Sequence, residues 1–180
     1  MPLAAAIALL LVVLGGCGGG GDRHESGSAA TLDDAYVYCY PLVMMSVSQR
    51  VATNVVEATS AKVPVNQLRH AQRLAGPDFK DVVTPNVDTL YSQAFIDLKD
   101  GPLVFVKPAA DRYCSAQFLD AWTNSVGIAG TGGREGTSGE QVCLLMRSDD
   151  KTTVPAGMTP FRFSGNLGWI IGRTLCRGGD

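Results

Sequence analysis

The sequence predicts an α+β fold, with an N-terminal helical region followed by a mostly antiparallel β-sheet or β-sandwich. Apolar residues recur at steps of three and four between residues 32 and 55, which is the period of a helix with one buried face. After Pro85 the pattern changes to partial alternation, in runs rich in β-branched and aromatic residues that turn residues separate. A helical region followed by successive strands is typical of α+β proteins.

The residues before this fold predict an exported lipoprotein. Residues 3–14 are almost wholly apolar, yet such a run is shorter than the roughly 20 residues that a helix needs to cross a bilayer. It ends at Leu14-Gly15-Gly16-Cys17, and small residues before a cysteine are typical of a lipobox. We expect a signal peptide over residues 1–16 and lipidation of Cys17. Ordinary secretion and a buried apolar helix are the alternatives.

Residues 17–30 are rich in glycine and serine and lack periodicity, so they are expected to form a flexible tether behind the lipid. Gly18 stands where an aspartate would direct retention in the inner membrane. The expected location is therefore the bacterial cell envelope, at the outer membrane and facing the periplasm. The chain has 15 basic and 17 acidic residues and no basic run, which excludes nucleic-acid binding as a function.

Residues 31–180 are long enough for a single domain with its own core. Thr31 and Asp34 form a capping box at the start of the expected helix, and Pro41 is expected to kink or divide it. A shorter helical or irregular piece covers residues 66–74. Strands are expected over residues 89–98, 103–107, 113–119 and 141–146. The six glycines of residues 127–139 predict a surface loop, and residues 166–175 look like the start of a helix.

The cysteines and the histidines give no metal or cofactor motif. Four cysteines follow Cys17, and none has the close CxxC spacing of a zinc or redox site. They are Cys39, Cys114, Cys143 and Cys176. Buried thiols and disulfides both remain open, since pairing cannot be deduced from sequence. His70 lacks a second histidine at helical spacing, and the glycine-rich residues 130–136 match no phosphate-binding pattern, so we expect no metal and no cofactor.

Several segments resemble a bacterial family called domain of unknown function 1254. The most specific is Pro85-Asn86-Val87-Asp88-Thr89-Leu90-Tyr91-Ser92, and Ala35-Tyr36-Val37-Tyr38, Asp120-Ala121-Trp122-Thr123-Asn124 and Trp169-Ile170-Ile171-Gly172-Arg173-Thr174 add to it. The resemblance implies an exported protein in which a second domain, domain of unknown function 1214, usually follows. By this comparison the chain is incomplete at its C-terminus, so a homo-oligomer or a separate partner domain is expected to cover an apolar face.

Two functional hypotheses remain open. In the first, the protein is an envelope lipoprotein that binds a ligand or a partner chain through Asn86, Tyr91, Trp122 and Asn124, which are expected near one edge of the sheet. In the second, it is an enzyme that acts on a small polar or sugar-like substrate.

The enzyme hypothesis makes Asp88 a general base, with Asp97 or Asp120 as the second carboxylate. A serine hydrolase would need Ser92 or Ser46 beside His70, but the chain has no GxSxG motif. Asn86, Asp88 and Thr89 could instead bind the backbone of their own turn. Residue types alone leave open whether the protein is an enzyme.

Overall fold

The computed structural model describes residues 31–80, 83–131 and 138–177. The expected signal peptide, Cys17 and the tether lie outside these residues. The chain divides into two units, Met1–Leu32 and Asp33–Asp180, and every described strand belongs to the second unit. Among the described residues one helix precedes mostly antiparallel sheets, which confirms the α+β class. In chain order the elements are α2 (Leu32–Thr53), β1 (Arg69–His70), β2 (Thr89–Asp97), β3 (Leu103–Lys107), β4 (Cys114–Asp120), β5 (Ser125–Gly130), β6 (Gln141–Arg147), β7 (Met158–Phe163) and β8 (Leu167–Leu175).

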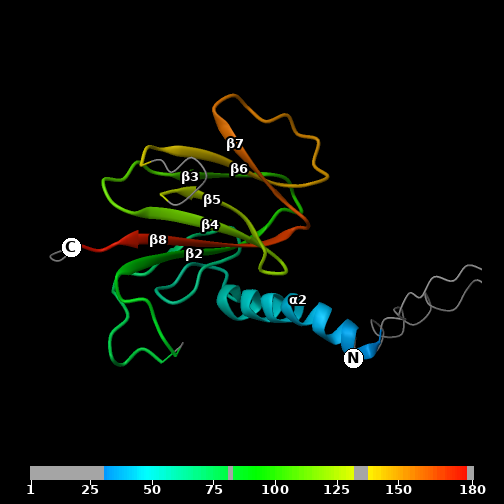
Figure 1. The fold of residues 1–180 in the computed structure, drawn as a ribbon, viewed down its shortest axis with the longest axis horizontal. Helices are drawn as coiled ribbons and strands as arrows, with labels where there is room; N and C mark the ends of the chain where they lie inside the picture. The colour runs from blue at the N-terminus through cyan, green and yellow to red at the C-terminus, as the bar shows by residue number, and fades with distance from the viewer. Residues whose placement is uncertain (1–30, 81–82, 132–137, 178–180) are drawn as a thin grey trace, which may run out of the picture. The chain divides into compact units, whose positions relative to one another are not determined.

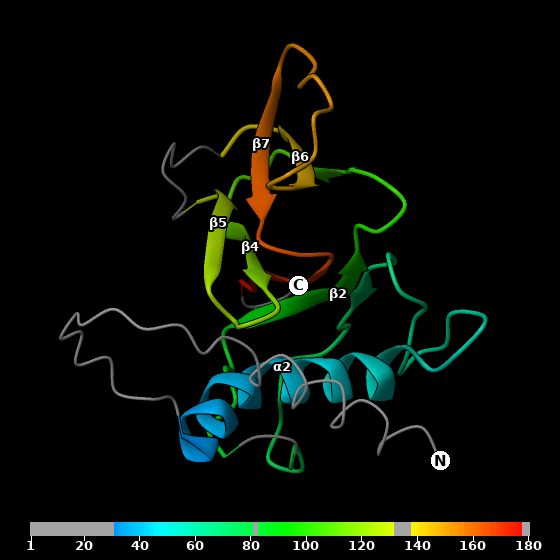
Figure 2. The ribbon, with the colours of Figure 1, turned by 90° about the vertical axis from the view of Figure 1, so that its right-hand side faces the viewer.

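Helix α2 runs without a break through Pro41, so the proline does not divide it. Asp33 and Asp34 lie in its first turn and Arg50 in its last turn, where their charges oppose the helix dipole. Met45 is its buried residue, and it faces the rest of the fold. Figures 1 and 2 both place α2 on the side of β2 that is away from β3, β6 and β7.

The larger sheet has the order β1-β2-β8-β4-β5, and all its neighbouring strands are antiparallel. Strand β8 pairs with β2 along its whole length and with β4 on its other side. The predicted helix over residues 166–175 is therefore wrong. Ile170, Ile171 and Thr174 favour a strand, and a Cβ on Gly172 would lie 3.1 Å from Cβ of Ser92 on the neighbouring strand.

The smaller sheet has the order β3-β6-β7, with β6 and β7 parallel. The sequence did not predict β7. It predicted a loop over residues 127–139, but residues 127–130 belong to β5. Gly127 and Gly130 obscured β5, because glycine carries no alternating side chain. A Cβ at Gly127 would overlap the ring of Phe161 from β7, so the glycine makes room for an aromatic side chain of the smaller sheet. Residues 132–137 of the predicted loop lie outside the described residues.

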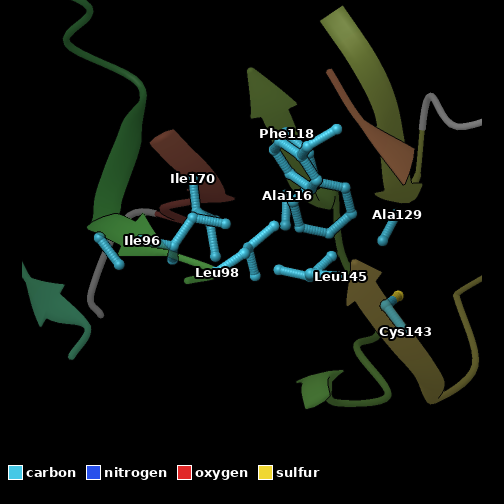
Figure 3. Packing of buried hydrophobic residues seen from close by; sticks show 10 residues of the cluster. Ile96, Leu98, Ala116, Phe118, Ala129, Cys143, Leu145 and Ile170 are labelled. Carbon is cyan, nitrogen blue, oxygen red and sulfur yellow. The ribbon is translucent and has the colours of Figure 1, made fainter. Parts of the chain in front are cut away.

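The core lies between the two sheets (Figure 3). Phe118 of β4 is at its centre, with its ring 5.4 Å from that of Phe105 and 4.6 Å from that of Phe161. Ala94 and Ile96 of β2, two positions apart and so on the same face of the strand, belong to the same cluster. Odd-numbered residues of β2 therefore project to the opposite face of the larger sheet.

No disulfide joins any of the four described cysteines, and they differ in burial. Cys143 is buried in the core, Cys114 and Cys176 are half-buried, and Cys39 is exposed on α2. Of the two alternatives that the sequence left open, buried thiols and disulfides, a buried thiol is present at Cys143 alone among the described cysteines.

Candidate functional site

Asp120 is a structural carboxylate at the end of β4. Its side chain accepts hydrogen bonds from the backbone N–H groups of Trp122 and Asn124, both at 2.9 Å. It also accepts bonds from Nδ2 of Asn124 and Oγ of Ser164, each at 3.2 Å. The side chain is buried and shapes the turn in which Thr123 has a φ of 66°.

Asp88 and Asp97 lie at opposite ends of β2, so the three candidate carboxylates do not converge. Asp97 accepts a hydrogen bond from the backbone N–H of Lys99 and pairs with its ammonium group at 3.9 Å. In the register of the sheet Asp120 is level with Ile96, through Gly168, and Ile96 faces the core. Because Asp97 is the next residue along β2, it projects to the other face of the sheet.

The turn before β2 is capped by Asn86 and not by Asp88. Oδ1 of Asn86 accepts the backbone N–H groups of Asp88 and Thr89 at 2.8 and 2.9 Å. The expected Asx motif is confirmed at Asn86, while the carboxylate of Asp88 is exposed. Because Oδ1 of Asn86 already accepts these two backbone bonds, the residue has a structural role in the turn.

Trp122 and Asn124 lie together in the β4–β5 turn, far along the sheet from Tyr91. The Trp122 ring lies 6.0 Å from the ring of Tyr38 on α2. Tyr91 pairs with Arg173, whereas the turn follows Leu119, which pairs with Trp169 at the other end of β8. The four predicted ligand-binding residues thus occupy three separate places and not one edge of the sheet.

Tyr91 instead belongs to a cluster on the face of the larger sheet that is turned away from the core. We name it the tyrosine–arginine face, and it consists of Tyr91, Tyr113, Ser115 and Arg173. Tyr91, Arg173 and Ser115 are directly opposite one another across β2, β8 and β4. The guanidinium carbon of Arg173 lies 5.4 Å from the centre of the Tyr91 ring, and its Nε donates to Oη of Tyr91 at 3.5 Å.

The other half of this face is a second hydroxyl pair. Oγ of Ser115 donates to Oη of Tyr113 at 3.0 Å. Within the described part of the chain Arg173 makes no ion pair with a carboxylate. The tyrosine–arginine face therefore presents a half-buried cation together with the hydroxyl groups of Tyr91 and Tyr113, and the buried hydroxyl group of Ser115 donates to that of Tyr113.

Sequence reasoning found Tyr91 but missed Arg173, Tyr113 and Ser115 as site residues. Residues 166–175 were expected to be helical, so the strand period that places Trp169, Ile171 and Arg173 on one face was not applied. Alternation within that segment was the available signal. The cross-strand partners could not be predicted, because the pairing register of two strands that are distant in sequence cannot be inferred from either strand alone.

The structure also brings together two residues that the hydrolase hypothesis required. Nδ1 of His70 lies 2.8 Å from Oγ of Ser92, and the two residues are direct partners of β1 and β2. No carboxylate among the described residues hydrogen-bonds the His70 ring, which is exposed on a two-residue edge strand. The contact fastens β1 to the sheet, and it lacks the acid that orients the histidine of a triad.

No group of three potential metal ligands occurs among residues 31–80, 83–131 and 138–177. Within the same residues no helix is long and apolar enough to span a membrane.

Comparisons with known proteins place this fold in context. None of the curated proteins that were compared matches the chain. A crystal structure of the VPA0106 protein from Vibrio parahaemolyticus matches with a TM-score of 0.60 and 19% identity, over 81% of this chain and 32% of that chain. The chain thus spans about a third of the protein that it matches, and the likeness shows a shared fold. The family model described as protein of unknown function (DUF1254) matches residues 65–180, and the chain therefore belongs to the DUF1254 family.

Proposed function

We propose that this protein is an exported envelope lipoprotein, anchored to the outer membrane through Cys17, whose β-rich unit binds a small anionic ligand at the tyrosine–arginine face. The lipobox that ends at Cys17 supports the anchor, and the glycine-rich tether after it would hold the folded unit away from the lipid surface. The proposal makes the protein a binding module and not an enzyme.

The observation that carries the binding proposal is the uncompensated guanidinium of Arg173. Half-buried cations normally have an anionic partner, because desolvation of a charge is costly. Arg173 has an aromatic ring and a phenol oxygen, but no carboxylate, within the described residues. A planar guanidinium can hold a carboxylate or a phosphate group with two parallel hydrogen bonds. The hydroxyl groups of Tyr91, Tyr113 and Ser115 could bind neighbouring polar atoms of the same ligand.

The carboxylate-dependent enzyme gains no support from the same geometry. Asp120 already accepts bonds from two backbone N–H groups, an amide and a hydroxyl. Asp88 and Asp97 are at opposite ends of one strand. General acid–base catalysis by a pair of carboxylates would need two of them within hydrogen-bonding distance of the same substrate.

The test is titration calorimetry on the chain that carries Cys17→Ser, which keeps the protein unlipidated. The probes are glucuronate, the uncharged analogue glucose, and inorganic phosphate. We expect glucuronate or phosphate to bind and glucose not to bind. Arg173→Gln should abolish this binding, and Arg173→Lys should weaken it because an ammonium cannot make the two-pronged contact.

Arg162→Gln is the matched control, because Arg162 is an exposed arginine that donates to the carbonyl oxygen of Asp150 away from this face. Equal binding by Arg173→Gln and by the parent chain, or equal affinity for glucose and glucuronate, would refute the anionic site. Tyr91→Phe separates the ring contact with Arg173 from the hydroxyl contact, since phenylalanine keeps the ring and lacks the hydroxyl group.

A further inference from the structure

Helix α2 carries an apolar stripe on the side opposite to its buried residue. Met45 is 4% exposed, and it marks the side that packs on the rest of the fold. At 100° per residue, positions 36, 40, 43 and 47 fall together on the opposite side of the helix. Their exposed fractions are 67% for Tyr36, 50% for Tyr40, 56% for Val43 and 47% for Val47. The rings of Tyr36 and Tyr40 contact each other along this stripe at 5.8 Å.

The stripe has the spacing of a coiled-coil seam and a charge at each end. Asp33 precedes it and Arg50 follows it, so positions 33, 36, 40, 43, 47 and 50 recur at alternating steps of three and four. This alternation is the a and d pattern of heptads. Neither Asp33 nor Arg50 forms an ion pair within the described part of the chain.

The pattern is symmetric about a point between Tyr40 and Val43. If a second copy of α2 lies antiparallel across a two-fold axis at that point, Tyr40 of one chain faces Val43 of the other. Tyr36 then faces Val47, and each aromatic ring is set against a β-branched side chain. The same operation sets Asp33 against Arg50 at both ends of the pair. The antiparallel arrangement also places each helix N-terminus beside a C-terminus, which the helix dipoles favour.

We propose that α2 is a homodimerisation helix, and that its occupant is the α2 stripe of a second copy of this chain in an antiparallel two-fold pair. The complementary charges support a second copy, because a two-fold interface must be self-complementary. The helix dipole alone favours an acid in the first turn and a base in the last turn, but it does not require both to lie on the apolar stripe at equal distances from one centre. The seam covers only about two heptads, so the dimer is expected to dissociate on dilution.

The decisive experiment is a charge swap in the full chain, expressed in bacteria with two different affinity tags and extracted in mild detergent. Asp33→Arg should weaken self-association, because the introduced guanidinium would then face Arg50 of the other copy at both ends. Arg50→Asp should do the same by placing two acids together. We expect each to form about tenfold less homodimer than the parent chain, since two symmetric ion pairs become repulsive.

Coexpression of Asp33→Arg with Arg50→Asp should restore copurification of the two tags to the parental level, because both ends of the mixed pair then avoid the repulsion between like charges. Val47→Asp should abolish copurification, while the control Val56→Asp should not, since Val56 is 95% exposed and lies beyond the helix. Restoration in the mixed pair is a result that a folding defect cannot produce.

Three results would overturn the proposal. The parent chain could remain monomeric at tens of micromolar in a light-scattering measurement. The mixed pair could copurify no better than the single variants, which would mean that charge complementarity does not guide the contact. Alternatively, Val47→Asp could reduce sedimentation with phosphatidylglycerol vesicles while the parent chain stays monomeric, which would assign the stripe to a lipid surface.

Discussion

Asp120 is the residue at which the structure makes its sharpest quantitative prediction. Asp120→Ala removes the acceptor for two backbone N–H groups, one amide and one hydroxyl group. The side chain of Asp120 is 7% exposed, so water cannot easily replace it. Asp120→Asn keeps one oxygen for the backbone groups of Trp122 and Asn124, and both Ser164 and the amide of Asn124 can reorient toward its new NH₂ group.

The expected magnitude follows from these contacts. An unsatisfied buried donor costs about 1–3 kcal/mol. Two of them, partly relieved where the backbone of the turn relaxes, should reduce the free energy of unfolding by roughly 2–4 kcal/mol in Asp120→Ala. Asp120→Asn should lose about 1 kcal/mol or less, because its backbone contacts survive. For a unit of this size the alanine variant should melt roughly 5–15 °C lower than the parent chain.

Urea unfolding followed by tryptophan fluorescence measures both variants, and Trp122 reports directly on the turn that Asp120 shapes. Asp88→Ala is the matched control, since the carboxylate of Asp88 is exposed and caps no backbone group of the described residues, and the unfolding free energy of this variant should change by less than about 0.5 kcal/mol. If Asp120→Ala were as stable as Asp88→Ala, the reasoning would fail, and Asp120 would be free for a chemical role. A stability loss in Asp120→Asn equal to that in Asp120→Ala would show that charge, and not acceptor geometry, holds the turn.

Three further predictions concern other parts of the chain. Cys17→Ser should abolish metabolic labelling with palmitate and move the protein from the membrane fraction to the soluble fraction; wild-type membrane recovery would contradict the anchor. Gly130→Ala should lose roughly 2–4 kcal/mol of stability, because Gly130 has a φ of +85° and a Cβ there would overlap the carbonyl oxygen of Cys114. Gly157→Ala, with a φ of +82° and open space around it, should lose only about 1 kcal/mol. The hydrogen bond and the charge of Arg112 hold the pKa of Asp111 below its ordinary value of 3.8, so this carboxylate stabilises the fold above that pH and loses its contribution as the pH falls through the lower, folded pKa. Asp111→Asn should therefore flatten the acid limb of a stability–pH curve and leave the curve near pH 7 parallel to that of the parent chain.

The elements that local pattern alone determines were predicted from the sequence. Helix α2 was predicted from its period and its capping residues, and β2, β3, β4 and β6 from short runs of β-formers between turns. Strand β8 was mistaken for a helix because both of its faces are largely covered in the middle of a sheet, so Trp169, Ile170 and Ile171 give a continuous apolar run. Such a run fits a helix and a buried strand equally well.

The candidate site was predictable only where it depends on neighbours in sequence. Asn86 and Thr89 are three positions apart, and their turn was expected and is present. The tyrosine–arginine face joins residues from three strands, and nothing in any one strand states which residues of the others it will face. The sequence showed that His70 and Ser92 are residue types that could interact. It could not predict the pairing of β1 with β2 that brings them together.

The order of strands makes the C-terminal strand β8 the link between β2 and β4, a role that could not be predicted from its sequence. Because β8 lies between β2 and β4, those two strands do not pair with each other, and Tyr91 and Ser115 become parts of one face only when β8 places Arg173 between them. Pairing between segments so distant in sequence must first overcome the entropy of closing a long loop. Until then β2 and β4 each expose an unpaired edge, which is a surface prone to aggregation. Ligand binding at the tyrosine–arginine face should protect the amide hydrogens of β8 more than those of β3 or β6, since the proposed ligand contacts Arg173 of β8.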